Sequence, residues 1–298
     1  MTVRRPLFVV NPSAGGGRAA HLIDPIRAAA RSRGGEVACT ERSGHAEQLA
    51  RQAASQGFDA VVGVGGDGTL NEVANGLLQA ESSVPLGAIP AGTGNDFVRS
   101  LGLPPDPLAA LRTVWSSAER EIDLGRCGER VFLNAAGVGF DSRAARTAQR
   151  FPNALKVGTL PYVAGVLLEL VRNTAHAFCL EFDGRRLEKR MLMVAVANGA
   201  FYGGGMMICP RAARDDGLLD VCTVGDMPRR EVLRLLPKVF SGGHVGHPMV
   251  EFFRTTELTI ECAAGSEIQL DGELVGRLPA VFRAAPRALR VLSGATNG

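Results

Sequence analysis

Short apolar runs alternate with segments of helical periodicity through the first 120 residues. β-Branched residues concentrate at 61–64, and apolar residues at 70, 73, 74, 77 and 78 then follow the 3.6-residue period of a helix. Other apolar runs that predict buried strands lie at 7–10, 36–40 and 85–89, with helices expected at about 19–32 and 43–56. Strands that alternate with helices in this way predict a parallel, doubly wound α/β sheet.

The pattern changes after about residue 121, where strand-like runs follow one another with few helical segments between them. These runs lie at 131–136, 178–182, 191–197, 218–224, 257–262, 267–270 and 288–292. Helical spacing returns only near 155–172 and 228–240. This half therefore predicts an all-β sandwich or barrel. We divide the chain into residues 1–120 and 121–298, and the last strand can pack against either domain.

Three glycine-rich loops, at 11–18, 65–68 and 90–96, directly follow predicted strands. The carboxyl ends of parallel strands meet at one edge of a sheet, so these loops are expected to face one crevice. A glycine loop that leads into a helix presents backbone N–H groups to a phosphate. Thr69 at the start of the helix and Glu72 three residues later predict a capping box.

The loop after residue 62 also fits a dinucleotide fingerprint, through Gly63, Gly65 and Gly68. Asp67 argues against that interpretation, because a carboxylate beside a pyrophosphate is repulsive unless a divalent cation lies between them. The loop at 11–18 lacks the Lys-Ser/Thr ending of a P-loop, which argues against a Walker-type NTPase. A carboxylate inside a phosphate loop favours chemistry on a magnesium nucleotide.

Composition excludes some classes of partner. The 298 residues carry a net charge of +3 and contain one Trp and two Tyr, which argues against nucleic-acid binding but permits an anionic membrane surface. Six cysteines without a C-x-x-C pattern predict reduced core residues of a cytoplasmic protein. We find neither a signal-peptide pattern nor an apolar segment long enough to span a bilayer, so we expect no transmembrane segment and only peripheral membrane contact.

Two further segments attract attention. His244-Val-Gly-His247 lies in a glycine-rich loop without Cys or acidic residues nearby, so zinc binding there is disfavoured. His45 begins a predicted helix and is interpreted as a capping or surface residue. Residues 198–206, with Phe201, Tyr202 and the glycine run 203–205, predict a cleft loop, with a plain glycine-rich turn as the alternative.

Five motifs occur in a fixed order along the chain. They are Asn11-Pro-Ser-Ala-Gly, Gly65-Gly-Asp-Gly-Thr-Leu-Asn-Glu, Pro90-Ala-Gly-Thr-Gly-Asn-Asp, Asp216-Gly-Leu-Leu-Asp and Asp271-Gly-Glu. Together they resemble the diacylglycerol kinase catalytic family, which includes bacterial lipid kinases and sphingosine kinases. NAD kinases share Gly-Gly-Asp-Gly-Thr and phosphofructokinases carry a close variant, so the later motifs make the resemblance specific.

The resemblance implies an α/β nucleotide domain followed by a β-sandwich, with the active site in the cleft between them. It also implies ATP as co-substrate together with Mg²⁺, and Asp67 acting through the metal and ordered water. Phosphoryl transfer relies on positioning and charge neutralisation, which glycine-loop amides and metal-bound carboxylates supply. The implied ATP-site residues are Asn11, Pro12, Ser13, Ala14, Gly15, Thr40, Gly65, Gly66, Asp67, Gly68, Thr69, Leu70, Asn71, Glu72, Thr93 and Asn95.

A structural Mg²⁺ site is implied at Asp216-Gly217-Leu218. The resemblance assigns the Asp216 side chain and the backbone carbonyls of Ala213 and Leu218 as ligands, and oxygen-only ligation suits Mg²⁺. Arg214-Asp215 departs from the family pattern, and Asp215 competes as a ligand. From the residues alone, this stretch is an acidic turn before a strand.

Asp271-Gly272 joins two strand-like segments and by itself predicts a type I′ hairpin. The resemblance places the catalytic base here. Glu273 is favoured as the base and Asp271 as a partner in the Mg²⁺ network or an orienting group, although the two roles can be exchanged. A base must lie within hydrogen-bond reach of the lipid hydroxyl.

The sequence therefore predicts an ATP-dependent lipid kinase acting at the membrane surface, with diacylglycerol as the favoured acceptor and phosphatidic acid as the product. One alternative is an NAD kinase-like enzyme, and another is a catalytically silent nucleotide- or lipid-binding regulator, which the intact Asp67, Asp216, Asp271 and Glu273 disfavour. No motif specifies which lipid alcohol is used. The resemblance also allows a homodimer.

Overall fold

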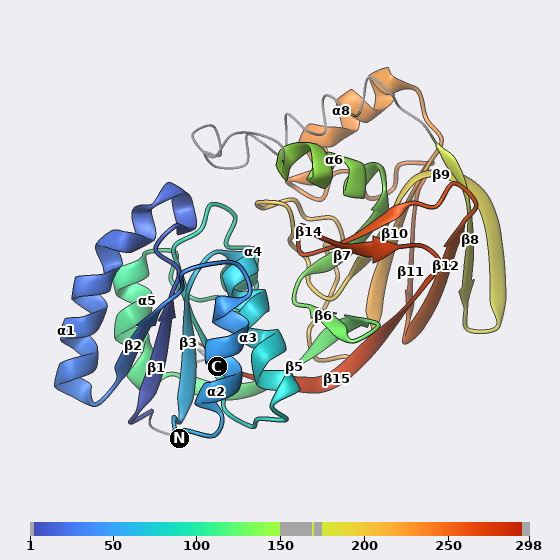
Figure 1. The fold of residues 1–298 in the computed structure, drawn as a ribbon. Coiled ribbons are helices and arrows are strands. Elements are labelled where there is room, and N and C mark those ends of the chain that lie inside the picture. Colours follow the sequence, from blue (N-terminus) through green and yellow to red (C-terminus); the bar gives the residue numbers. More distant parts are fainter. Residues whose placement is uncertain (1–2, 150–168, 170–174, 294–298) are drawn as a thin grey trace. The chain divides into compact units, whose positions relative to one another are not determined.

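The computed structural model describes residues 3–149, 169 and 175–293, which form two compact units. Unit 1 comprises Met1–Ile122 and Arg287–Gly298, and unit 2 comprises Asp123–Pro286. Figure 1 shows that helices and strands alternate in the first unit, whereas strands dominate the second. An α/β domain followed by a β-sandwich is thus confirmed.

Unit 1 is built on a parallel sheet in the order β2-β1-β3-β4. Its strands are β1 (Pro6–Val10), β2 (Glu36–Cys39), β3 (Ala60–Gly65) and β4 (Leu86–Pro90). At the far edge, Val291 near the end of β15 (Ala280–Ser293) pairs in parallel with Leu86. Every residue of β1, β3 and β4 is buried, because helices cover both faces of a doubly wound sheet.

Helices cover both faces of this sheet (Figure 1). One core layer joins Phe8 of β1 to Ile26 of α1 (Ile23–Arg33), Leu111 of α5 (Pro107–Thr113) and Trp115 of η3 (Val114–Ser116). Against the other face lie α2 (His45–Ala53) and α3 (Asp67–Gln79). The expected helix at 19–32 divides into η2 (Arg18–Leu22) and α1, after the short turn η1 (Ala14–Gly16).

The strands of unit 2 pair in an antiparallel manner, and helices cover part of the sheet. Its strands are the second part of β5 (Ala118–Cys127), β6 (Arg130–Phe132), β7 (Ala135–Gly139), β8 (His176–Phe182), β9 (Arg185–Ala197), β10 (Leu219–Gly225), β11 (Val250–Thr255), β12 (Glu257–Cys262), β13 (Glu267–Leu270), β14 (Glu273–Arg277) and the first part of β15. The long strand β9 pairs with β8 along its first half and with β7 and β10 along its second half. β9 therefore links the two parts of the sandwich.

The two faces of β9 belong to different cores. Val194 and Val196 pack with Leu258 and Phe282 in the interior of the sandwich. Ala195 and Ala197 point to the opposite face, where α6 (Phe140–Gln149) and α8 (Arg229–Val239) cover them. This alternation follows from the two-residue period of a strand. Leu192 joins the same core as Ala195 because the β9–β10 pairing shifts register beside it, between Val224 and Gly225. The predicted helix at 228–240 is confirmed, while the one at 155–172 lies outside the described residues except for Glu169.

Three strands, β5, β11 and β14, were not predicted from the pattern of apolar residues. β5 and β11 carry several charged residues, and β14 is largely exposed and contains Gly276. The run at 131–136 forms two strands, because extended pairing stops at Leu133-Asn134, the two-residue break between β6 and β7. That break forms part of the candidate site in unit 2.

Candidate active site

In unit 1 the loops that follow β1, β3 and β4 touch one another at the carboxyl edge of the sheet, as expected. A Cβ atom added to Gly15 would lie 2.4 Å from the Ala91 carbonyl oxygen, and one added to Gly92 would lie 2.3 Å from the Gly66 Cα atom. Both distances are far below van der Waals contact, so only glycine permits this approach. Gly92 was not among the predicted site residues.

Asn11 fastens the first loop to α3. Its Nδ2 atom donates a hydrogen bond to Thr69 Oγ1 (3.1 Å), and its Oδ1 atom accepts one from the Ser13 backbone amide (3.1 Å). Pro12 and Ala14 are half-buried in the same loop and Ser13 is exposed. The Thr40 amide donates to the Val10 carbonyl oxygen (2.8 Å), which places Thr40 beside the end of β1.

The predicted capping box at Thr69 and Glu72 is wrong. The residue that precedes α3 is Gly66, which makes no side-chain cap, and Thr69 is a buried residue within the first turn. Glu72 reaches a different helix, where its carboxylate accepts hydrogen bonds from the amides of Gly44 (2.9 Å) and Ala46 (3.1 Å). Both side chains have partners that are distant in the sequence. Asn11 occupies the Thr69 hydroxyl, whereas the start of α2 has amides without helical partners.

Asp67 also caps a neighbouring helix. Its Oδ1 atom accepts a hydrogen bond from the Phe97 amide (2.8 Å) in the first turn of α4 (Asp96–Ser100). Asn95 has φ 53° and accepts from the Gly92 amide through Oδ1 (3.0 Å), while Thr93 is exposed. Asp96 was not predicted as a site residue, yet it is buried and forms an ion pair with Arg99 (2.7 Å).

Two predicted ATP-site side chains serve the packing of α3. Leu70 is fully buried against Gly63 of β3. Asn71 is buried as well, and its Oδ1 atom accepts a hydrogen bond from Asn75 Nδ2 (2.8 Å) one turn later. The region from Gly65 to Gly68 surrounds the N-terminus of this 13-residue helix. Its first-turn amides and dipole favour an anion such as a phosphate.

In unit 2 the predicted type I′ turn is confirmed. β13 and β14 pair antiparallel up to Leu270 and Glu273, and the two residues between them have positive φ, 47° at Asp271 and 91° at Gly272. Positive φ at both central residues defines this turn type. Glu273 is half-buried at the start of β14.

The Asp271 carboxylate is held by the break between β6 and β7. It accepts hydrogen bonds from three successive backbone amides, those of Leu133 (2.6 Å), Asn134 (2.9 Å) and Ala135 (3.1 Å). The Asp271 amide in turn donates to the Ala135 carbonyl oxygen (3.0 Å). Ionised carboxylates form stronger hydrogen bonds than neutral acceptors, so this set of contacts fixes the turn firmly.

Arg214 binds the same two residues between β6 and β7, Leu133 and Asn134. Its guanidinium donates to Asn134 Oδ1 (2.7 Å) and to the Leu133 carbonyl oxygen. A Cβ atom added to Gly199 would collide with this guanidinium at 2.2 Å, so the backbone of Gly199 lies flat against it. Arg214 appeared in the sequence only as a departure from the family pattern. Its burial, with 8% exposed, indicates a structural role for that departure.

A second set of buried hydrogen bonds reaches the turn through Gln269. Gln269 Oε1 accepts from the Gly272 amide (2.6 Å), and Gln269 Nε2 donates to Asp141 Oδ2 (2.7 Å). Asp141 Oδ1 accepts from the Tyr202 hydroxyl (3.0 Å). The predicted cleft loop at 198–206 is thus connected to the Asp271-Gly272-Glu273 turn. The signal in the sequence was a polar residue inside an apolar strand, as in Ile268-Gln269-Leu270.

Asp216 lies on the turn before β10. Its Oδ1 atom accepts a hydrogen bond from the Leu218 amide (3.0 Å), and its Oδ2 atom is 3.5 Å from the Arg254 guanidinium. Asp215 is exposed and Ala213 is half-buried. Across the described residues, no three His, Cys, Asp or Glu side chains come together in a way that could hold a metal ion. A metal ion here would depend on backbone carbonyls, as the resemblance implied.

Asp220 gives an independent indication that a cation fits this turn. Its Oδ2 atom is buried and accepts no hydrogen bond. Burial, and then the charge of Asp216, raise the pKa of Asp220 to about 6, although Arg254 opposes the rise. A cation at the turn would offset both effects. The oxygen donors that the resemblance implies here, the Asp216 carboxylate and the carbonyls of Ala213 and Leu218, are of the chemical type that Mg²⁺ prefers.

The two loop histidines have protein partners. His244 is buried, with Nε2 2.9 Å from the Ile208 carbonyl oxygen, and His247 Nε2 is 3.2 Å from Glu231. His45 accepts a hydrogen bond from the Glu41 amide through Nδ1 (3.1 Å). Each of the three side chains thus has a protein partner for one ring nitrogen.

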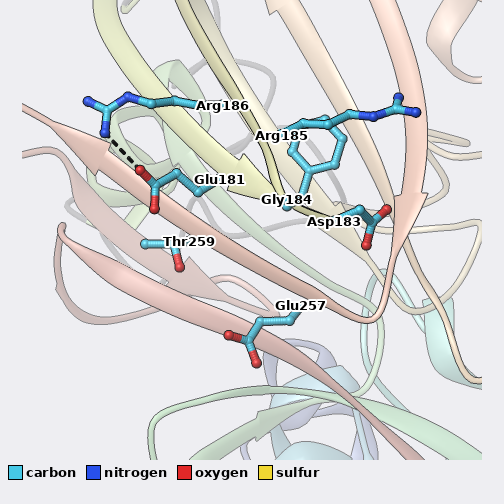
Figure 2. Close-up of a pocket in the computed structure, with 8 residues that line it drawn as sticks. Glu181, Asp183, Gly184, Arg185, Arg186, Glu257 and Thr259 are labelled. Carbon is cyan, nitrogen blue, oxygen red and sulfur yellow. Dashed lines mark hydrogen bonds and ion pairs between the residues drawn. The ribbon is translucent and has the colours of Figure 1, made fainter.

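Figure 2 shows an open pocket of about 400 Å³ at the β8–β9 hairpin. Charged side chains line it, and Arg186 forms an ion pair with Glu181 across one wall (2.8 Å). Its lining contains none of the predicted site residues. In the described part of the chain, no helix is long and apolar enough to cross a membrane.

Comparison with known proteins matches two family models in tandem. Residues 5–127 match the diacylglycerol kinase catalytic domain, and residues 134–293 match the YegS C-terminal NAD kinase beta sandwich-like domain. The structure of a diacylglycerol kinase from Bacillus anthracis str. Sterne covers 99% of this chain and 98% of its own, with a TM-score of 0.77 and 23% identity. That likeness shows a shared fold.

Curated relatives are closer in sequence. A diacylglycerol kinase of Mycobacterium tuberculosis (strain ATCC 25618 / H37Rv) is 38% identical over 256 residues, which is 83% of this chain and 81% of the relative. A protein of Pseudomonas aeruginosa (strain UCBPP-PA14) named "Probable lipid kinase YegS-like" is 36% identical over 269 residues, covering 89% and 87%. The chain therefore belongs to the diacylglycerol kinase catalytic-domain family and is a lipid kinase.

Proposed function

We propose that this lipid kinase transfers the γ-phosphate of Mg-ATP to the hydroxyl of diacylglycerol and so forms phosphatidic acid. The observation that carries the proposal is the Asp271-Gly272-Glu273 turn, which backbone amides and buried side chains hold from two sides. A hairpin turn with no functional role would not need a carboxylate that three backbone amides hold in place. The name of the Mycobacterium tuberculosis relative favours diacylglycerol among lipid alcohols.

Unit 1 supplies the nucleotide site in this proposal. The amides around Gly66 and Gly68, at the N-terminus of α3, bind phosphate oxygens, and the glycine contacts at Gly15 and Gly92 keep the surrounding loops close to the sheet. Asp67 is tied to the first turn of α4 through one carboxylate oxygen. From that position it orients water around the nucleotide's Mg²⁺. Thr40, Thr93 and Asn95 line the same edge.

Unit 2 supplies the base. Glu273 removes the proton from the acceptor hydroxyl while Asp271 orients the turn. The contacts of Asp271 support this division of roles, because protonation of its carboxylate would weaken hydrogen bonds to three backbone amides at once. Asp271 is therefore the anchor, and Glu273, which is half-buried directly after Gly272, is the proton acceptor.

A structural Mg²⁺ at the Asp216 turn completes the proposal. It stabilises the turn that carries Arg214, the residue that holds the break between β6 and β7. Adding Mg²⁺ should raise the melting temperature of the wild-type protein, and Asp216→Asn should remove that shift. An equal rise in the melting temperature of both proteins would mean that Mg²⁺ binds at a site other than the Asp216 turn.

We also place the enzyme in the cytoplasm, in peripheral contact with the membrane. The test of the activity is incubation with γ-labelled ATP, Mg²⁺ and mixed micelles that contain a panel of lipid alcohols, with NAD in a parallel reaction. Label in phosphatidic acid supports the proposal. Label in another lipid replaces the acceptor but keeps the reaction, and label in NAD alone contradicts the lipid acceptor.

A further inference from the structure

The outward face of α8 combines basic and apolar residues. Val232, Leu235, Leu236 and Val239 pack into the core of unit 2, which leaves the opposite side of the helix exposed. The exposed residues on that side are Arg229, Arg230, Leu233, Arg234, Pro237 and Lys238. We call this set, together with Phe240 and Val245 just beyond the helix, the α8 face.

Exposed apolar side chains concentrate in this region. Six large hydrophobic residues are exposed among the described residues, and three of them, Leu233 (47%), Phe240 (40%) and Val245 (44%), belong to the α8 face. A fourth, Phe252, contacts the ring of His244 next to Val245, with centroids 5.6 Å apart. Single exposed hydrophobic residues are ordinary, but a cluster marks an interaction surface.

The charge of the α8 face has one sign. Arg229, Arg230, Arg234 and Lys238 contribute four positive charges, and the structure gives none of them an ion pair with another described residue. The nearby acids are engaged elsewhere, since Glu231 contacts His247 and Asp226 contacts Arg190. The partner of this face is therefore expected to be anionic as well as apolar.

We propose that the α8 face docks the enzyme on an anionic phospholipid bilayer. Basic side chains around Leu233, with Phe240 and Val245 just beyond the helix, suit the boundary between headgroups and acyl chains, where the cations meet lipid phosphates and the apolar groups enter the membrane. The inference rests on the lipid kinase function, because an acceptor with acyl chains is delivered from a membrane. No residue of the face belongs to the proposed catalytic or nucleotide sites.

Vesicle sedimentation tests the proposal without reference to catalysis. The wild-type protein should bind vesicles of phosphatidylcholine mixed with phosphatidylglycerol and bind pure phosphatidylcholine much more weakly. Replacing both arginines in Arg230→Gln/Arg234→Gln should weaken binding roughly 10-fold or more, given the attraction of each cation to an anionic surface. Leu233→Ser should also weaken binding, by several-fold, through the loss of apolar contact.

The chain offers matched controls in unit 1. Arg27 and Arg31 are exposed on α1 with the same four-residue spacing, and Leu108 on α5 is 41% exposed. Arg27→Gln/Arg31→Gln and Leu108→Ser should leave vesicle binding unchanged. Phosphorylation of a short-chain diacylglycerol dissolved as monomers should be normal in all four variants, whereas phosphorylation of vesicle-borne substrate should fall only in the two α8 variants.

Several results would overturn the proposal. They are equal binding to both kinds of vesicle, equal losses in the control variants, or unchanged binding after substitution on α8. A concentration-dependent dimer that Leu233→Ser abolishes would assign the face to a second copy of the chain instead. If the wild-type protein phosphorylated no lipid, the proposed reaction would fail while the sedimentation result would still decide the docking surface.

Discussion

The two candidate sites are built by opposite means. In unit 1 the loops approach one another because side chains are missing, as at Gly15 against Ala91 and Gly92 against Gly66. In unit 2 the Asp271-Gly272-Glu273 turn is fixed by buried polar side chains, directly by Gln269 and indirectly by Arg214, which binds the Leu133-Asn134 segment. Backbone amides take part in both. In our proposal those at the start of α3 bind a phosphate, whereas those of Leu133 and Asn134 bind the protein's own Asp271 in unit 2.

This difference predicts different responses to mutation. A site made of glycine contacts fails when volume is added, because backbone atoms cannot move aside. A site made of hydrogen bonds fails when a donor or acceptor is changed at constant volume, and it recovers when complementarity is restored. The following predictions test this contrast, from the largest expected effect to the smallest.

Glu273→Gln should abolish most of the phosphoryl transfer. The amide keeps the size of the side chain but cannot accept the proton of the acceptor hydroxyl, so kcat should fall by about 10²- to 10⁴-fold. The affinity for ATP, measured by calorimetry, should stay at the wild-type value because the nucleotide residues lie in unit 1. Near-normal turnover would show that Glu273 is not the base.

Gly92→Ala should damage unit 1 as a whole. The added methyl group would meet the Gly66 Cα atom at 2.3 Å, and we expect a loss of about 1–3 kcal/mol in the free energy of unfolding together with weaker ATP binding. Chemical denaturation and calorimetry measure the two effects. Gly276→Ala is the control, since a Cβ atom there meets nothing within 4 Å and φ is not positive. Equal losses in both variants would contradict the contact argument.

Exchanging the acid and the amide between residues 141 and 269 should preserve the hydrogen bonds that hold the turn. Asp141→Asn leaves a single oxygen at residue 141 for two donors, the Tyr202 hydroxyl and Gln269 Nε2, so either two NH₂ groups meet at Gln269 or the Tyr202 hydroxyl must turn to accept. The turn should shift and kcat fall by up to about 100-fold with little change in the KM for ATP. Gln269→Glu alone should also lower kcat, because two carboxylates meet, with partial recovery at acidic pH.

The double variant Asp141→Asn/Gln269→Glu restores one donor and one acceptor at each contact, so kcat should return toward the wild-type value. Hydrogen exchange at the Gly272 amide should rise in the single variants and fall again in the double variant. Thr255→Val is the control for a buried hydroxyl that bonds Asp183 instead of the turn. If the double variant were as impaired as the singles, the hydrogen bonds would not be what positions Glu273.

The buried His244 should make the free energy of unfolding depend on pH, and this effect should be smaller than those above. Burial lowers the pKa of His244, although its hydrogen bond to Ile208 opposes the change. The Ile208 carbonyl can only accept, so Nε2 carries the proton and the buried Nδ1 has no hydrogen-bond partner. The unfolded state takes up a proton near the ordinary pKa of 6.5, before the folded state does. The free energy of unfolding should therefore be full above that pH and decline below it.

Denaturation curves between pH 7.5 and about 5 measure this slope. His244→Gln should flatten it, and His21→Gln, on an exposed residue of η2, should not. A slope that His244→Gln leaves unchanged would mean that other groups dominate the acid response.

Much of the fold followed from patterns that are local in the sequence. The β-branched run before Gly65 predicted β3, and the spacing of Leu70, Val73 and Leu77 predicted α3. Asp271-Gly272 predicted the turn because its backbone requires positive φ at both residues. In each case the signal and the structure that it specifies lie within a few neighbouring residues.

The remaining features depend on partners distant in the sequence. Glu72 had the spacing of a capping box, but the amides that it binds belong to α2, 26 and 28 residues earlier. Asp271 binds amides 136 to 138 residues away. Arg214 and Asp141 look like surface residues in a helix or turn, and only the packing of unit 2 buries them. The proposed catalytic and nucleotide roles stay predictions, since they concern molecules that the chain must bind.

The last strand has a consequence for synthesis on the ribosome. β15 pairs with β12 through residues 280–283, and only its final residues reach unit 1, where Val291 lies beside Leu86 and Leu292 enters the core. Residues 6–90 of unit 1 are therefore synthesised well before Val291, the residue that pairs with the edge of β4. An open β-edge invites pairing with other nascent chains. Truncation after about residue 286 should therefore yield a protein that aggregates through its first domain.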